Sequence, residues 1–360
     1  MKVLCIGLAA YNITSRVDSF PVEGNKYKIH EKLENGGGFA YDAAYLLANW
    51  GVESYISAIV GSDEYGNRIR KELEQNNVKT DFLETSYDRP TSVALVLVNK
   101  SNGMSTSFDL TYEKAHIKKE LWSIEPDYIL GDNSEYHAFI TAINRFPSKD
   151  SFVYADKNDL ETKEICKYAK YILGSLDFAT AETKVTVDFN NPSTLVELYN
   201  KLLNRYPRSK IVITLGTHGA LYSKDGKVCL MRGLGLTAAD ASGSSNIFRA
   251  AFVYGVGVGY DLEKCMQIAN IAAGLSVEKF GNKTSIPPLN EVLAYYTKKF
   301  APQEYAVPEI SESTEEVGEE PESLEDTQVQ SVETQNPQQL TQSVNSANPG
   351  VNPPAIQNNG

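Results

Sequence analysis

The first 300 residues alternate between short apolar runs, typical of buried strands, and longer segments in which apolar residues recur at helical spacing. Strands that alternate with helices predict an α/β fold with a doubly wound, mainly parallel sheet and helices on both of its faces. The strand candidates are Val3–Ile6, Tyr55–Val60, Tyr128–Leu130, Phe152–Ala155, Tyr171–Leu173 and Ile211–Thr214, and the clearest helices are Tyr41–Trp50, Asp63–Gln75 and Ile247–Val258.

Two segments break this alternation because they have strand patterns with no helix between them. Lys26–Leu33 is the first, and Ser92–Asp109, with the turn pair Asn102-Gly103, is the second. Asn-Gly between alternating strands is typical of a hairpin. We expect a small antiparallel sheet, with strands near residues 25–35 and 91–110, that forms a lid over a small-molecule site. Packing between two copies of the chain is the alternative role, and a homodimer through the lid is compatible with both. A second hairpin is expected at Leu221–Cys229.

The formal net charge of −12 is concentrated at one end of the chain. Residues 301–360 contain ten Glu, one Asp and no Lys or Arg, so residues 1–300, with 34 basic and 35 acidic side chains, are close to neutral. The acidic and then Gln-, Asn-, Pro- and Ser-rich composition predicts a disordered tail, with binding of a basic partner as the alternative. The neutral body, a single domain over residues 1–300, gives no indication of a nucleic-acid surface.

The chain also lacks the usual signals for membranes and secretion. It has no apolar run of about 18 residues that could span a bilayer, and its first eight residues are more typical of a buried strand than of a signal peptide. The four cysteines are too scattered for a disulfide framework or a zinc site. We therefore expect a cytoplasmic protein with no membrane contact.

Three glycine-containing loops are candidates for binding. Gly36-Gly37-Gly38 precedes a helix with Asp42 in its first turn, and residues 240–246 form a Gly/Ser loop that opens another helix. Backbone N–H groups at a helix N-terminus bind anions such as phosphate. Thr214–Gly219 is a strand end with two glycines three residues apart. Each loop has a purely structural alternative, as a tight turn or a helix cap.

Taken in chain order, these pieces resemble the ribokinase-like, PfkB-type carbohydrate kinase family. Gly37–Gly51 resembles the first signature of that family and Asp240–Phe248 the second, usually written D-T-x-G-A-G-D-x-F. Val60–Gly66, Thr214–Gly219 and Asp261–Pro287 resemble the turn, the nucleotide-binding strand end and the closing helix. The resemblance covers residues 1–300 and implies ATP-dependent phosphoryl transfer to a hydroxyl of a sugar or nucleoside, with Mg²⁺ and often K⁺.

The resemblance also implies roles for single residues. The loop Gly243, Ser244 and Ser245 corresponds to the anion hole, and Asn246 takes the position of the catalytic base. Asp240 corresponds to a residue near the monovalent cation. The residues that correspond to sugar contacts are Asn12, Gly37, Gly38 and Asp42, and those that correspond to nucleotide contacts are Thr214, Gly216, Gly219 and Asn270.

The departures from the family pattern fall on the chemistry. The base position holds Asn246 in place of Asp, and a carboxamide cannot accept a proton at neutral pH. Ser245 replaces a glycine of the anion hole. Ser175 and Phe178 stand where many relatives carry an N-x-x-E motif that helps to organise Mg²⁺, although other branches of the family carry Ser and Phe there. The sequence therefore leaves open a kinase with weakened chemistry and a catalytically inactive sensor or scaffold that binds sugar or nucleotide.

One pair of departures suggests a compensation within the sugar pocket. The early Asp of the family is Asn12 here, and the Asn of its first signature is Asp42. If both side chains face the same sugar, the carboxylate and the amide have exchanged places.

Overall fold

The computed structural model describes residues 1–29, 31–111 and 113–300, and the side chain of residue 282 is not described. The described residues belong to one compact unit. The tail predicted to be disordered, residues 301–360, lies outside the described residues. Everything that positions the candidate site therefore belongs to the first unit.

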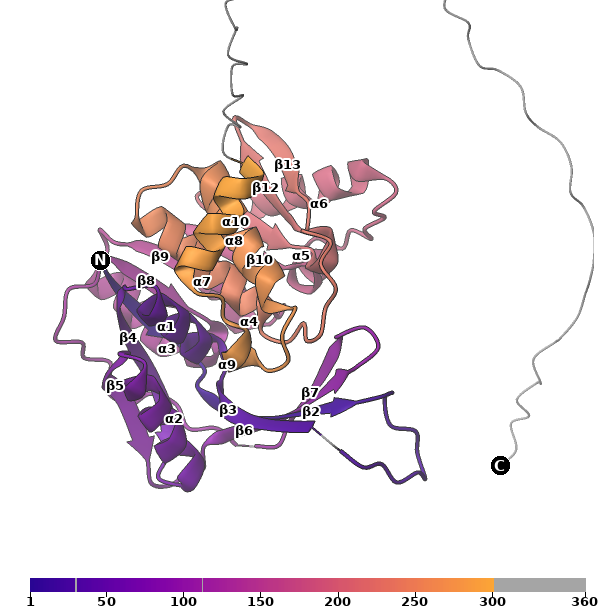
Figure 1. Ribbon diagram of the computed structural model, residues 1–360. Helices are drawn as coiled ribbons and strands as arrows, with labels where there is room; N and C mark the ends of the chain where they lie inside the picture. Colours follow the sequence, from indigo (N-terminus) through magenta and orange to yellow (C-terminus); the bar gives the residue numbers. More distant parts are fainter. Residues whose placement is uncertain (30, 112, 301–360) are drawn as a thin grey trace, which may run out of the picture. The chain divides into compact units, whose positions relative to one another are not determined.

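A large, mainly parallel sheet runs through this unit (Figure 1). Its strand order is β13-β12-β11-β10-β9-β8-β1-β4-β5. Among the strand pairs described in this sheet, β11–β12 and β12–β13 are antiparallel and the others are parallel. This confirms the α/β prediction. The strands are β1 (Lys2–Ile6), β4 (Glu53–Gly61), β5 (Lys79–Ser86), β8 (Tyr128–Gly131), β9 (Asp150–Ala155), β10 (Tyr171–Ser175), β11 (Lys210–Thr214), β12 (Ala220–Lys224) and β13 (Lys227–Met231).

Helices cover both faces of this sheet, because successive side chains of its strands point to opposite sides. In β1, Val3 and Cys5 pack into one apolar cluster and Leu4 and Ile6 into another. The first cluster includes α1 (Phe39–Asn49), α2 (Glu64–Gln75), α7 (Ser244–Gly257), α8 (Leu262–Ser276) and α10 (Leu289–Phe300). The second includes α3 (Tyr136–Arg145), α4 (Leu160–Cys166), α5 (Leu176–Thr183) and α6 (Pro192–Arg205).

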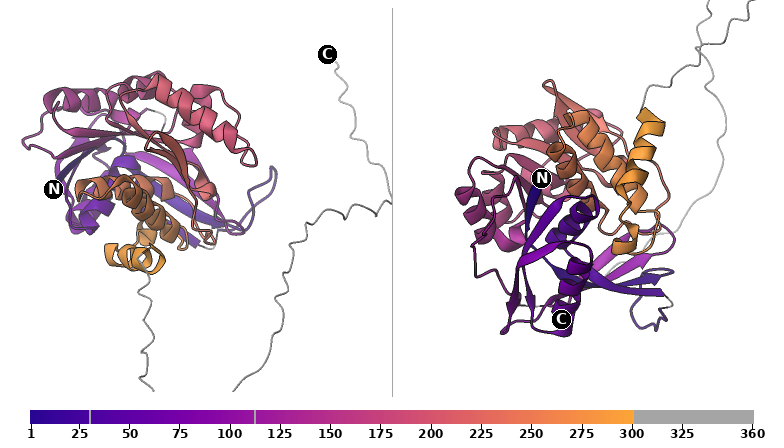
Figure 2. Two further views of the ribbon diagram at one scale, coloured as in Figure 1. Left: turned by 90° about the horizontal axis from the view of Figure 1, so that it is seen from above. Right: turned by 60° about the vertical axis from the view of Figure 1, so that its left-hand side comes forward.

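A separate four-stranded sheet projects from the body (Figure 2). Its order is β3-β2-β6-β7, with β2 parallel to β6 and the other two pairs antiparallel, so the small sheet is mixed and not wholly antiparallel. A short helix, α9, lies beside β3. The bounds are β2 (Ala10–Val17), β3 (Glu31–Gly37), β6 (Ser92–Asn99), β7 (Ser105–Asp109) and α9 (Asn282–Ser285).

The first lid strand was misplaced by the sequence analysis. The strand expected at Lys26–Leu33 begins at Glu31 and continues to Gly37. Its bounds follow from pairing with β2, a strand that the sequence analysis did not predict, because Glu31 pairs with Arg16 and Gly37 with Ala10. Polar and apolar alternation alone cannot locate a strand whose register depends on a partner elsewhere in the chain.

Both predicted hairpins are present. The one at residues 92–109 has a five-residue connection between β6 and β7 that contains Gly103 at φ +69°. The other joins β12 to β13 through Asp225 and Gly226, with φ of +50° and +74°. Two consecutive positive φ values are typical of the tight hairpin turns that match strand twist.

Candidate functional site

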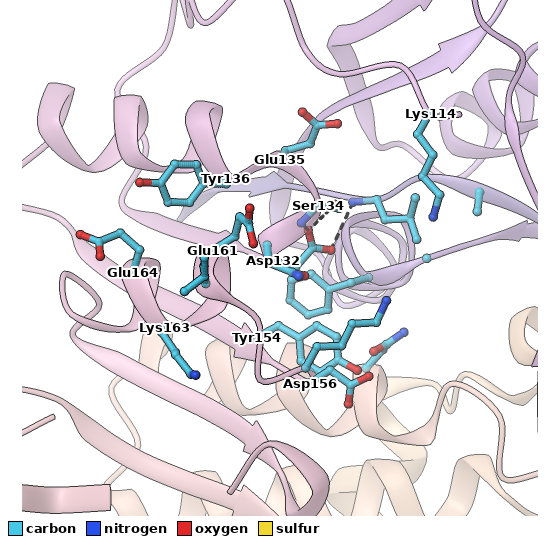
Figure 3. A pocket seen from close by; sticks show the side chains of 18 of the residues that line it. Lys114, Asp132, Ser134, Glu135, Tyr136, Tyr154, Asp156, Glu161, Lys163 and Glu164 are labelled. Atoms are coloured by element: carbon cyan, nitrogen blue, oxygen red, sulfur yellow. Dashed lines mark hydrogen bonds between the residues drawn. The ribbon is translucent and has the colours of Figure 1, made fainter. Parts of the chain in front are cut away.

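A cavity of about 1400 Å³ lies where the carboxyl ends of the central strands meet the small sheet (Figure 3). Of the predicted site residues, Asn12, Gly38 and Asn246 line it. Figure 3 shows that Asp132, Ser134, Tyr154 and Asp156 also point into it. The open end of a parallel sheet is where α/β proteins bind their ligands.

Gly37 and Gly38 connect the small sheet to α1 at one side of the cavity. Gly38 has φ +92°, and a Cβ there would lie 2.6 Å from the carbonyl oxygen of Leu8. That carbonyl accepts the backbone N–H of Ala40 at 3.1 Å. A Cβ on Gly37 would lie 2.2 Å from the amide nitrogen of Asn12. Glycine is therefore required here for close packing, whether or not a ligand binds.

The loop before α7 is held by Asp240 and by the small sheet. Asp240 is buried; its Oδ1 accepts the N–H and the hydroxyl of Ser242 at 2.9 and 2.6 Å, and its Oδ2 accepts the N–H of Gly281 at 2.9 Å. The tip of the β6–β7 hairpin contributes the carbonyl of Gly103, which accepts the N–H of Ala241 at 2.8 Å. The loop is thus fixed from two sides.

The N-terminus of α7 lies in the loop that the sequence predicts to bind an anion. Gly243, in the left-handed region at φ +74°, turns the chain into the helix that starts at Ser244, and no side chain in the described part of the molecule caps it. Within the first turn, Ser244 donates its N–H to the carbonyl of Ala241 at 3.4 Å, and Asn246 donates its N–H to the carbonyl of Gly243 at 2.9 Å. The N–H of Ser245 and the positive end of the helix dipole are left to favour an anion. Ser244 and Ser245 occupy this first turn, as the sequence predicted for an anion hole.

Asn246 and Asp42 meet between α7 and α1. The Nδ2 of Asn246 donates a hydrogen bond of 2.7 Å to the Oδ2 of Asp42. Asp42 is 2% exposed, whereas Asn246 lines the cavity. The structure therefore brings the predicted base position into direct contact with the predicted sugar residue on the other helix, which the sequence did not suggest.

The predicted nucleotide residues lie around the end of β11 and on α8, and they are not among the described residues that line this cavity. The Oγ1 of Thr214 donates to the carbonyl of Gly174 at 3.3 Å, and the amide of Asn270 donates to the carbonyl of Arg232 at 2.8 Å. Gly216 and Gly219 have φ of +58° and +102°. A Cβ on Gly219 would overlap the carbonyl of Met231, so that glycine is required by packing.

Arg249 links the two groups of residues, and the sequence analysis missed it. Its side chain is fully buried, and the guanidinium carbon lies 3.9 Å from the ring centroid of Tyr154. Its Nε donates a hydrogen bond to the carbonyl of Leu173 at 3.0 Å, and its Nη2 donates one to the Oγ1 of Thr214 at 3.4 Å. Its Nη1 has no hydrogen-bond partner among the described residues. Burial lowers the pKa of Arg249. Its place within an apolar helix gives no sequence signal.

Asp132 and Asp156 were also missed, although a signal for them exists, since each directly follows a buried strand that the sequence predicted. Asp132 accepts the N–H of Leu8 at 3.2 Å and both the N–H, at 2.9 Å, and the hydroxyl of Ser134. Burial raises the pKa of Asp132. Asp156 is exposed to the cavity.

Two glutamates on the cavity wall are engaged by other groups. Glu135 accepts the N–H of Ile117 at 3.0 Å, and burial raises its pKa to about 8. Burial also acts to raise the pKa of Glu182, but hydrogen bonds from Arg205, Asn158 and Tyr206 outweigh that effect and leave the pKa lowered.

No helix among the described residues is long and apolar enough to cross a membrane. Within the same residues, no cluster of three or more His, Cys, Asp or Glu side chains could hold a metal ion.

The sequence profile described as pfkB family carbohydrate kinase matches residues 1–289. The chain is similar to a ribokinase of Bacillus subtilis, at 27% identity over 81% of this chain and 98% of that protein. It is also similar to a nucleoside kinase of Methanocaldococcus jannaschii, at 24% identity over 81% of this chain and 95% of that one.

Solved structures give the same result for the fold. A ribokinase of Thermotoga maritima matches with a TM-score of 0.68 at 21% identity, over 82% of this chain and 99% of that one. An Arabidopsis thaliana ribokinase, solved in complex with ribose and ATP, matches with a TM-score of 0.66 at 20% identity, over 81% of this chain and 97% of that one. At these identities the likeness shows that the α/β body and small sheet form a ribokinase-like fold.

Proposed function

We propose that this chain, which belongs to the pfkB family of carbohydrate kinases, transfers the γ-phosphoryl group of ATP to a hydroxyl of a sugar or nucleoside. The observation that carries the proposal is the uncapped N-terminus of α7, which follows Gly243 and has Asn246 facing the cavity. Phosphoryl transfer depends on positioning and on neutralising charge, and a helix N-terminus beside a cavity supplies both.

In this proposal the site has an acceptor half and a nucleotide half. The N–H groups of Gly243, Ser244 and Ser245 bind the transferred phosphoryl group. The acceptor hydroxyl lies in the cavity, in contact with Asn246. The remaining acceptor contacts are Asn12, Gly37, Gly38 and Asp42, and the nucleotide contacts are Thr214, Gly216, Gly219 and Asn270.

Mg²⁺ supplies neutralisation of the phosphate charges when it is bound with ATP. It takes oxygen ligands and is usually held by one or two carboxylates together with phosphates and water. Asp156 fits that need, because its carboxylate is exposed to the cavity, whereas Phe178 brings no ligand. For K⁺ we propose the neighbourhood of Asp240, whose carboxylate organises the loop.

The acceptor class follows from the relatives. They include ribokinases, nucleoside kinases, an ATP-dependent ribose-1-phosphate kinase and an ATP-dependent 6-phosphofructokinase. A pentose, a sugar phosphate and a nucleoside are therefore the acceptors to test first. We expect turnover to be slowed by the loss of a carboxylate at position 246.

A catalytically inactive sensor or scaffold is the second candidate. It is favoured by Asn246 and Phe178, because the first lacks proton affinity and the second lacks a metal ligand. Such a protein would bind sugar or nucleotide in the same cavity without turnover.

The test measures ADP release and phosphorylated product with ATP and Mg²⁺ against ribose, ribose 1-phosphate, fructose 6-phosphate and a set of nucleosides. Product formation supports the kinase. Thermal stabilisation by nucleotide or sugar without product supports the sensor, and neither response contradicts both.

Two further expectations stand as proposals. Exposed apolar side chains lie on the small sheet and the segment leading to it, including Val22, Phe108 and Leu110, and they support a homodimer through the lid, which sedimentation analysis tests. The described cysteines are all free, which suits the reducing conditions of the cytoplasm.

A further inference from the structure

The inference concerns where the proton of the acceptor hydroxyl goes, and it rests on the proposed phosphoryl transfer. The side chain that faces the cavity at the start of α7 is Asn246, which cannot take up a proton at neutral pH. The side chain directly behind it is a carboxylate. Asp42 lies on the first turn of α1, with its Oδ2 2.7 Å from the Nδ2 of Asn246.

Two other carboxylates of the cavity wall are held by groups other than Asn246. Asp132 already accepts three hydrogen bonds from Leu8 and Ser134, and Glu182 is bound by Arg205, Asn158 and Tyr206. Asp42 is the carboxylate with a recorded contact to the residue that faces the ligand.

Two features of the structure act on a negative charge at Asp42. A carboxylate in the first turn of α1 is favoured by the positive end of the helix dipole and by the hydrogen bond from Asn246. In the proposed arrangement, position 246 lies in the first turn of α7, beside the proposed phosphate site. Moving the charge to α1 keeps the base within reach of the hydroxyl and leaves a neutral amide beside the phosphate.

We propose that Asp42 is the proton acceptor of the reaction and that Asn246 orients the hydroxyl. The substrate hydroxyl displaces the Asn246 amide as the hydrogen-bond donor to Asp42, while Asn246 remains in contact with the substrate oxygen. The substrate O–H bond breaks and its proton passes to the carboxylate of Asp42. The substrate oxygen forms a bond to the γ-phosphorus as the bond from that phosphorus to the bridging oxygen breaks, and ADP leaves with that electron pair.

The experiment compares kcat, both KM values and the pH dependence of kcat for the natural protein, Asp42→Asn, Asn246→Asp and the double exchange. Asp42→Asn should lower kcat by about 10²–10⁴-fold, the usual worth of a general base, with the KM for ATP unchanged because no nucleotide contact is lost. The double exchange should recover at least about tenfold of that loss, because a carboxylate and an amide are again paired.

Asn246→Asp tests the role of Asp42 as proton acceptor by adding a second carboxylate instead of removing one. It places two carboxylates within hydrogen-bond distance, so one of them should hold its proton to higher pH and the acidic limb of the pH profile of kcat should move upward. The matched control for Asp42→Asn is Asp261→Asn, which makes the same chemical change at the cap of α8 and should leave kcat unaltered.

The outcomes separate the two proposals. If the natural protein transfers phosphate and Asp42→Asn keeps its kcat, or if Asn246→Asp alone raises kcat across the pH range, Asp42 is not the base although the kinase assignment stands. If the natural protein transfers phosphate to none of the acceptors, the proposed function fails and the role of Asp42 fails with it. Should Asp42→Asn not fold, the pH profile of Asn246→Asp decides.

Discussion

The amide of Asn246 and the carboxylate of Asp42 form a 2.7 Å hydrogen bond that joins the first turn of α7 to the first turn of α1. The two residues are 204 positions apart in the chain. The contact ties the loop that is proposed to bind phosphate to the helix that is proposed to bind the acceptor.

Removing this hydrogen bond should destabilise the fold. Asn246→Ala takes a donor away from a carboxylate that is 2% exposed, which should lower the free energy of unfolding by roughly 1–3 kcal/mol. Urea denaturation measures it. The control is Asn270→Ala. The amide of Asn270 donates to the neutral carbonyl of Arg232, so its removal should lower the free energy of unfolding by less. Equal losses would show that the charge on Asp42 adds nothing.

The hairpin tip should matter for both stability and turnover. A Cβ at Gly103, where φ is +69°, would lie 2.6 Å from the carbonyl of Ala238, and Gly103 also accepts the N–H of Ala241. Gly103→Ala should therefore lower stability by at least about 1 kcal/mol and reduce kcat by displacing the loop before α7. Gly226→Ala has a similar φ of +74° but open space around it, so it reports the backbone strain alone. If both variants keep the natural kcat, the tip does not support the loop.

Arg249 should affect nucleotide binding more than stability. Arg249→Met removes a buried positive charge behind Thr214, and it should raise the KM for ATP about tenfold, equivalent to ~1.4 kcal/mol. The change in stability should be small, because the relieved cost of burying the charge offsets the lost hydrogen bonds. Steady-state kinetics and thermal unfolding measure the two effects. Arg249→Lys, which keeps the charge, should shift the KM less, and an unchanged KM in the Met variant would contradict this role.

Glu135 should make stability depend on pH. Burial raises its pKa in the folded chain to about 8 from its usual 4.5. Below pH 4.5 the carboxyl group is protonated in both the folded and the unfolded chain, so it does not lower the free energy of unfolding. As the pH rises from 4.5 to 8, the unfolded chain releases the proton while the folded chain retains it, so stability is lost across that window.

Glu135→Gln removes this titration and keeps an acceptor for the N–H of Ile117. The difference in unfolding free energy, variant minus natural protein, should therefore grow between pH 5 and pH 8, by roughly 1–4 kcal/mol. Urea denaturation at several pH values gives the difference. A difference that stays constant with pH would show that Glu135 is ionised in the folded chain.

Most elements that build the large sheet could be predicted because their signal is local, although its edge strand β5 (Lys79–Ser86) was not predicted. Apolar runs such as those of β9 and β10, and the helical spacing of α2, require no knowledge of the rest of the chain. The site loops at Gly38 and Gly243 were predictable for the same reason, since a glycine before a helix is visible in the sequence. The start of β3 was not, because its register is set by pairing with β2.

The sequence by itself determined the fold class and the loops that surround the site, since periodicity and turn chemistry act between near neighbours in the chain. Only the tertiary structure decided which side chains meet: Asn246 with Asp42, Arg249 with Thr214, and the hairpin tip at Gly103 with the loop before α7. These contacts join residues from about 35 to about 200 positions apart, and their existence depends on how the two helices and the small sheet pack around the open end of the parallel strands, which no local pattern encodes.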